Sequence, residues 1–179
     1  MTSRRRVVTG KTPEGVSVVT SDQQVEPVVL SLMPGFEFHR LWESDAPPAL
    51  PGSGDRPSAD SLQYFPPPGG YRAGFFTIGP QTVELAENVD VIAGLEELER
   101  NLPGMTAVME LENPGMHTTE TVDVDCIISG EVWLELDDGK EVHLKTGDVV
   151  IQNGTRHRWT NKTDQPCVMF SVLLGATGT

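Results

Sequence analysis

The sequence predicts an all-β, single-domain β-barrel with an N-terminal β arm and one short helix. Residues 105–175 form a series of short Val- and Ile-rich segments separated by turn residues, which is typical of β-sandwiches and barrels. The length of 179 residues suits one domain with a sizeable core. No internal repeat is seen, so one barrel is expected and not two.

The first part of the chain, residues 1–104, is expected to pack against the barrel. RRVVTG and GVSVVTSD flank a spacer with turn residues, which predicts an N-terminal hairpin. Residues 44–70 are crowded with Pro, Gly, Ser and Asp, which predicts a long irregular segment. GYRAGFFTIGP is then expected to form a strand.

One helix is expected within residues 88–102. Val91, Leu95, Leu98 and Leu102 recur at helical spacing. The Pro-Gly pair that follows is a helix stop signal. The apolar stripe predicts a helix that packs against the body of the domain.

The second part, residues 105–175, is expected to hold the remaining strands. They are the segments MTAVMELE, VDVDCIISG, EVWLELDDGKEVHLKTGDVVIQNG, HRWTNKT and CVMFSVLLG. Asp138-Gly139 predicts a tight hairpin within the third segment.

Composition excludes several partners. The formal charge is -13 and the pI is about 4.6, so the chain would repel nucleic acid and anionic membranes. No apolar run approaches the roughly 20 residues that a membrane helix needs, and no signal peptide follows the basic start. Cys126 and Cys167 are expected to be free thiols in a reducing compartment, with a single disulfide as the alternative. We therefore expect a cytoplasmic protein.

Two polar stretches are the candidates for a site. In a strand His117, Thr119, Thr121 and Asp123 share one face, because side chains alternate. A face of hydroxyls bounded by an imidazole and a carboxylate suits a cavity wall better than a packed core. Further on, GDVVIQNGTRHRWTN contains a second alternating histidine, His157.

These stretches resemble the two motifs of the cupin superfamily. The first motif is Gly-x5-His-x-His-x(3,4)-Glu-x6-Gly, and this chain has His117, Thr119, Asp123 and Gly130 at the corresponding spacing. The second motif is Gly-x5-Pro-x-Gly-x2-His-x3-Asn. Its matches here are Gly147, Gly154, His157 and Asn161, with one residue fewer before the Pro position. The resemblance implies a jelly-roll β-barrel over about residues 105–175, like that of small single-domain cupins.

The resemblance also implies a divalent metal ion. Cupins usually hold one with three histidines and a glutamate, so His117, Asp123 and His157 are the expected ligands. Thr119 stands where the second histidine would be, and a hydroxyl is a poor ligand. Two imidazoles and one carboxylate resemble open sites for Fe or Zn, and the resemblance allows Mn or Ni as well. The alternative is a vestigial site without metal.

Other residues are weaker candidates. Thr119 is expected to position substrate or bound water, and Arg72 to bind a substrate carboxylate, with an ion pair as its alternative. His39 is a weak candidate for the missing ligand, whereas His143 is expected to be exposed. Trp133 and Trp159 either line a pocket or pack in the core.

The expected function is that of a metal-dependent enzyme. It would act on a small aromatic or carboxylate-bearing metabolite, as a decarboxylase, dehydratase, isomerase or dioxygenase. The alternative is a non-catalytic cupin that binds a small molecule. We expect a homodimer, formed through sheet edges or exchange of the N-terminal arm.

Overall fold

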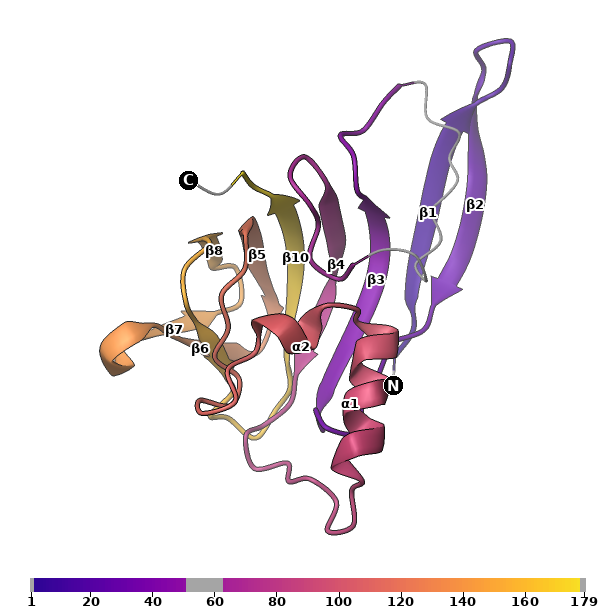
Figure 1. The fold of residues 1–179 in the computed structure, drawn as a ribbon. Coiled ribbons are helices and arrows are strands. Elements are labelled where there is room, and N and C mark those ends of the chain that lie inside the picture. Colours follow the sequence, from indigo (N-terminus) through magenta and orange to yellow (C-terminus); the bar gives the residue numbers. More distant parts are fainter. Residues whose placement is uncertain (1, 51–62, 178–179) are drawn as a thin grey trace.

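The computed structural model describes residues 2–50 and 63–177, and Figure 1 shows their arrangement. The elements, in chain order, are β1 (Arg4–Lys11), β2 (Ser17–Val25), β3 (Phe36–Ser44), β4 (Tyr71–Ile78), α1 (Val91–Asn101), α2 (Met105–Val108), β5 (Thr121–Ser129), β6 (Glu131–Glu135), a 3-10 turn (Asp137–Gly139), β7 (Glu141–Lys145), β8 (Val149–Asn153), β9 (Arg158–Thr160) and β10 (Cys167–Gly175). The predicted all-β class is confirmed.

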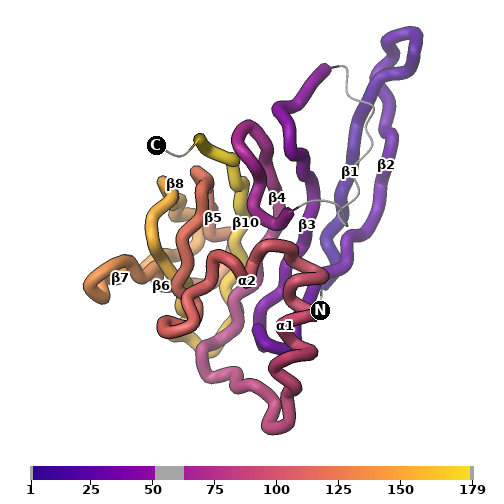
Figure 2. The backbone as a smooth tube through the Cα atoms, in the orientation of Figure 1, coloured from indigo at the N-terminus to yellow at the C-terminus, as the bar shows by residue number. Residues whose placement is uncertain are grey.

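Two antiparallel sheets make the jelly-roll-like barrel. One has the strand order β3-β4-β10-β5-β8 and the other β7-β6-β9, and the tube in Figure 2 shows how they lie next to each other. The first sheet combines β3 and β4 with strands from beyond residue 104, so both parts of the chain build the barrel. Alternate residues of β5 and β10 are buried. The core between the sheets is apolar and includes Ile78, Ile127, Val132, Leu134, Leu144, Cys167 and Met169.

The predicted N-terminal hairpin is confirmed. β1 and β2 pair only with each other among the described strands and extend beyond the barrel beside β3 (Figure 1). An Arg6 guanidinium nitrogen donates to the carbonyl of Leu41 at 3.0 Å. His39 Nε2 contacts the carbonyl of Thr2 at 2.8 Å. These bonds attach the hairpin to β3, and its proposed exchange between two copies stays a prediction.

The predicted helix is confirmed as α1. Asp90 caps it, because its carboxylate accepts hydrogen bonds from two amides of the first turn. Leu98 and Leu102 pack in a second core cluster with Phe38 of β3 and with Tyr64. The second half of the apolar stripe therefore packs against the body of the domain, whereas Val91 and Leu95 are 55% and 44% exposed.

The strand predicted for MTAVMELE is wrong. Gly104 has a φ of 85° and Met105–Val108 form the short helix α2. Met105 is buried in the same cluster as Leu102. A positive φ turns the chain just after α1, and the burial of Met105 holds the next residues near that helix. Extended structure returns only at Met109, which forms an isolated bridge with His117.

Other predictions about local structure are confirmed. β6 and β7 form a hairpin around Asp138, whose φ of 58° is left-handed, and aspartate tolerates that conformation better than most residues. Both cysteines are free thiols. Among the described residues no helix has the length and apolar character needed to cross a membrane.

Candidate functional site

The structure brings the two motif histidines together. His117 and His157 form a two-residue bridge in which each amide donates to the other carbonyl at 3.0 Å. Their ring centroids are 4.2 Å apart. His117 precedes β5, which begins at Thr121, so the single strand predicted to start at His117 is wrong.

Backbone carbonyls fix the tautomer of both imidazoles. His117 Nδ1 is 3.0 Å from the carbonyl of Gly115, and His157 Nδ1 is 2.8 Å from the carbonyl of Thr155. A carbonyl only accepts, so each Nδ1 carries the proton. When the ring is neutral, Nε2 therefore carries a lone pair. Metal-binding histidines and catalytic bases are commonly oriented in this way.

Both imidazoles are neutral at pH 7. Burial lowers the pKa of His117. Burial, together with the neighbouring His117, lowers the pKa of His157 to about 4. A buried imidazole resists protonation because the charged form loses its hydration. The pair therefore presents acceptor nitrogens and no positive charge.

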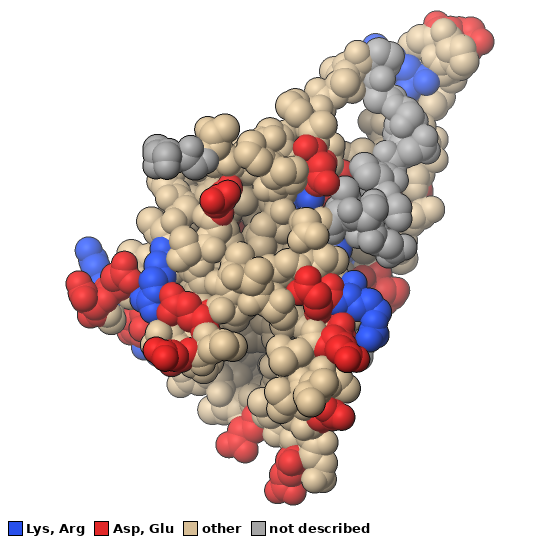
Figure 3. Space-filling view, viewed as in Figure 1, with Lys and Arg blue, Asp and Glu red and all other residues tan. Residues whose placement is uncertain are grey.

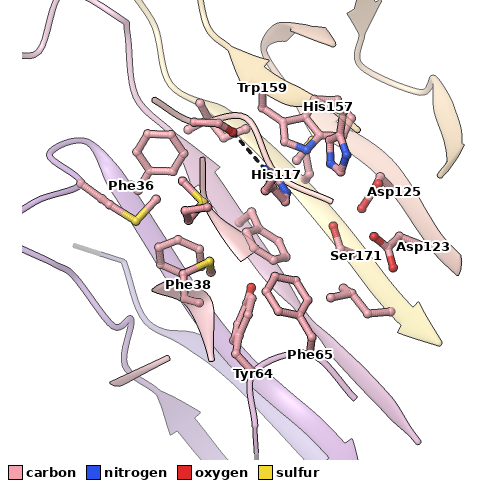
Figure 4. Close-up of a pocket in the computed structure, with 18 residues that line it drawn as sticks. Phe36, Phe38, Tyr64, Phe65, His117, Asp123, Asp125, His157, Trp159 and Ser171 are labelled. Carbon is pink, nitrogen blue, oxygen red and sulfur yellow. Dashed lines mark hydrogen bonds between the residues drawn. The ribbon is translucent and has the colours of Figure 1, made fainter. Parts of the chain in front are cut away.

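Two buried carboxyl groups lie beside the histidines. Asp123 and Asp125 project from the inward face of β5, near Ser171 of β10 (Figure 4). Burial raises the pKa of Asp123 to about 7 and that of Asp125 to about 6. Asp123 Oδ1 and Ser171 Oγ have no hydrogen-bond partner among the described residues. Unpaired buried polar atoms are rare in proteins and point to a ligand or a water.

Asp123 was predicted from the sequence as a site residue, whereas Asp125 was not. The signal was present, because the alternation that turns Asp123 inward also turns Asp125 inward. The structure shows that alternate residues from Thr121 to Ile127 are buried. The cupin motif has an acidic position that corresponds to Asp123 and none that corresponds to Asp125.

The histidines and carboxyl groups form one end of a cavity of about 110 Å³. Its remaining wall is mostly apolar, and Figure 4 shows aromatic rings around the space that the polar end faces. The residues of this wall, whose polar atoms are the Tyr64 hydroxyl and the Trp159 indole N–H, are Met33, Phe36, Phe38, Tyr64, Phe65, Phe76, Ile78, Met105, Met109, Trp159, Met169 and Leu173. Trp159 thus lines the cavity, in agreement with one of the two alternatives predicted for it. Such a cavity suits an apolar molecule with one polar group.

The predicted metal ligands are only partly assembled. In residues 2–50 and 63–177, no three His, Cys, Asp or Glu side chains gather closely enough to hold a metal ion. His117 and His157 offer two suitable nitrogens, but Asp123 does not complete the set. Thr119 Oγ1 is 2.8 Å from Thr121 Oγ1, and Thr119 is absent from the cavity lining. The side chains as placed therefore do not fit a three-ligand site.

Arg72, the other predicted catalytic residue, lies outside this cavity. Its guanidinium donates to the carbonyls of Ser44 and Gln63 and pairs with the carboxylate of Asp45. The side chain is only 6% exposed. Of the two roles predicted for Arg72, the contacts favour the ion pair, and the Arg72 side chain is buried.

Three further aromatic candidates lie away from the cavity lining. His39 is buried against the backbone of Thr2. His143 stacks on Trp133 with ring centroids 4.0 Å apart and contacts Glu131 at 2.7 Å. None of the three lines the cavity.

Residues 110–173 match the family model described as Cupin domain, Cupin_2. The barrel and the paired motif histidines agree with that match, which covers 64 of the 179 residues.

Curated relatives are fungal proteins. A 68-residue stretch is 40% identical to "Phomopsin biosynthesis cluster protein C'" of Diaporthe leptostromiformis, covering 35% of this chain and 36% of that protein. A 105-residue stretch is 30% identical to "Cupin-domain-containing oxidoreductase srdB" of Neurospora crassa, covering 55% and 54%. The matched region thus spans between about a third and about half of these relatives. Among solved structures, the cupin domain of Schizosaccharomyces pombe Cnp3 aligns with a TM-score of 0.48 at 9% identity, over 96% of this chain and 87% of that chain.

Proposed function

We propose that this protein is an enzyme that transforms a small organic molecule at the polar end of the cavity. One observation is the main support for the proposal. Two neutral imidazoles with Nε2 lone pairs and a buried carboxyl group with an unpaired oxygen face the same apolar space. The names of the relatives, biosynthesis cluster proteins and cupin-domain-containing oxidoreductases, support a role in small-molecule metabolism.

Asp123 is the residue best suited to move a proton. A pKa of about 7 leaves it protonated in about half of the molecules at neutral pH, so it serves as either acid or base. His117 and His157 would accept hydrogen bonds from the substrate through Nε2 and orient it. The apolar wall excludes water and strengthens these interactions. These residues support isomerisation, in which Asp123 takes a proton from one substrate atom and returns it to another. They also support dehydration, in which Asp123 takes a proton from carbon and delivers it to the hydroxyl that departs as water.

A metal-dependent reaction is the second candidate. The Nδ1 atoms of both histidines are held by carbonyls, as in many metal sites, and the word oxidoreductase in the relatives' names favours redox chemistry. A bound Fe, Zn, Mn or Ni ion would supply a Lewis acid or a site for oxygen. It requires a third ligand that the described side chains do not provide as placed, and we derive no step from it.

Metabolite profiling tests the proposed function. We expect purified wild-type protein to deplete at least one compound from an extract of its source organism. His157→Gln and Asp123→Asn should slow this depletion by at least about 100-fold, the usual contribution of acid–base groups. Val149→Ala, at a residue that is 55% exposed and lines no described cavity, is the control. Binding without turnover in the wild type would instead indicate a non-catalytic cupin.

Metal analysis separates the two candidate reactions. The protein should be purified anaerobically without a chelating tag and analysed by mass spectrometry for metals. About one equivalent of a single metal, lost in both His117→Ala and His157→Ala, would support the metal-dependent reaction. Full turnover by metal-free protein would support proton transfer by Asp123.

A further inference from the structure

The lining of the cavity contains carboxyl groups but no basic residue. Of the described side chains that surround it, the titratable ones are Tyr64, His117, Asp123, Asp125 and His157, and neither Lys nor Arg is present. A carboxylate or phosphate that entered would lose its hydration without meeting a positive partner, which is strongly unfavourable. The cavity therefore discriminates against anionic molecules, whereas the sequence had pointed to Arg72 as a carboxylate site.

The cavity offers several hydrogen-bond acceptors, and the hydroxyls of Tyr64 and Ser171 can both donate and accept. The Nε2 atoms of His117 and His157 are acceptors, and Asp123 Oδ1 is an unpaired oxygen. Ser171 Oγ is also unpaired and is 99% buried, since its exposed fraction is 1%. Asp123 is 7% exposed. A hydroxyl group on the ligand would donate to one of these atoms and satisfy the hydroxyl of Ser171.

The cavity alone is too small for most metabolites. Its volume is about 110 Å³, and a cavity of about 150 Å³ is known to hold a benzene molecule. Ligand sites for larger molecules usually have volumes of about 300 Å³ or more. The inner chamber is smaller than that cavity, so a single ring would fill it and extend beyond it.

A second chamber of about 580 Å³ adjoins the first. The two share a wall formed by Met33, Phe36, Ile78, Met105, Met109, Gly115 and Trp159. Several of these are methionines, whose flexible side chains adapt to different ligands. The space-filling view shows a hollow below its centre, on the face where this chamber opens (Figure 3).

The outer chamber is mostly apolar. Its own lining includes Leu32, Val83, Leu85, Leu95, Leu98 and Leu111. Its charged residues are engaged in ion pairs, Glu110 with Arg156 and Arg158 with Glu135. Burial of an apolar group here would be favourable by the area that it removes from water.

We propose that the substrate is an uncharged, amphipathic molecule. Its ring-sized head bears a hydroxyl group and occupies the inner chamber, and its apolar tail passes Met105 and Met109 into the outer chamber. Calling this molecule a substrate rests on the proposed function. The preference for a ligand of this kind follows from the two chambers themselves. The residues that line both chambers determine which apolar tails can bind.

Three probes test the preference by isothermal titration calorimetry with the protein as purified. They are phenol, 4-hexylphenol and 4-hexylbenzoate at about pH 7.5, where a phenol is neutral. We expect 4-hexylphenol to bind at least about tenfold more tightly than phenol, because its methylene groups leave water. It should also bind at least about tenfold more tightly than the anionic 4-hexylbenzoate.

A pair of variants on α1 locates the tail. Leu95 lines the outer chamber only and is 44% exposed, whereas Ile92 lines neither chamber and is 73% exposed. Leu95→Trp fills the outer chamber and should weaken 4-hexylphenol binding about tenfold, while phenol binding stays unchanged. Ile92→Trp should change neither.

Two results would overturn the proposal. One is 4-hexylbenzoate binding as tightly as 4-hexylphenol, and the other is no gain of 4-hexylphenol over phenol, including no detectable binding of either. Turnover of an anionic metabolite in the extract would contradict this inference and leave the proposed function standing. The predicted binding preference without turnover of any metabolite would do the reverse.

Discussion

Two buried polar regions of this protein differ in how their atoms are satisfied. Around Arg72 every guanidinium nitrogen has a partner, supplied by Ser44, Gln63, Asp45 and the carbonyl of Tyr71. At the polar end of the cavity, Asp123 Oδ1 and Ser171 Oγ have none among the described residues.

The difference separates a structural role from a functional one. Buried groups that satisfy each other stabilise the fold and leave nothing for a ligand. Unpaired groups at a cavity lower stability unless something binds, so a protein retains them where they act. By this criterion the site is the cavity and not the Arg72 cluster.

The largest expected effect is on stability at Arg72. Arg72→Met should lower the free energy of unfolding by about 3 kcal/mol, because it leaves buried acceptors and the nearby Glu43 without this cation. Urea denaturation followed by circular dichroism measures this. Arg5→Met, in an exposed pair with Asp22, should change the value by less than about 1 kcal/mol. An Arg72 variant of unchanged stability would mean that the cluster is not structural.

The carboxyl group of Asp123, in contrast to Arg72, should lower the stability of the folded protein, by an amount that depends on pH. Folded Asp123 keeps its proton up to a pH of about 7, whereas an unfolded aspartate loses it near pH 3.8. The folded protein thus binds more protons in this window and loses stability as the pH rises through it. Asp123→Asn should therefore be more stable than the wild type at pH 8 and nearly equal to it at pH 3.5.

His157 should contribute with the reverse sign. Its pKa falls from 6.5 to about 4 on folding, so an unfolded chain takes up this proton first and stability is lost as the pH falls through that window. His157→Gln should reduce the loss of melting temperature between pH 7 and pH 4. A variant with the same pH profile as the wild type would contradict the buried, neutral state of this imidazole.

Much of the fold could be predicted from local sequence. The hairpins follow from turn residues between Val-rich segments, and α1 from its apolar spacing and its stop signal. The pairing of His117 with His157 followed from two motifs in order. MTAVMELE was misread because Val and Met suit either structure, and only the turn at Gly104 and the burial of Met105 decide it.

The sequence could not show which buried polar groups have hydrogen-bond partners. The sequence left open whether Arg72 binds a substrate carboxylate or forms an ion pair, because tertiary folding brings its partners Asp45 and Gln63 to it. Thr119 looked like a substrate contact, yet its hydroxyl bonds to Thr121. Which buried atoms remain unpaired depends on the whole fold, and that property is what distinguishes the two regions.

The most direct test compares the two regions in one kinetic experiment. For a compound that the wild type consumes, kcat and KM should be measured for Asp123→Asn and for Arg72→Lys, with rates corrected for the folded fraction. We predict that Asp123→Asn loses at least about 100-fold in kcat, while Arg72→Lys stays within about threefold of the wild type. A large loss of kcat in folded Arg72→Lys, with Asp123→Asn unaffected, would contradict it.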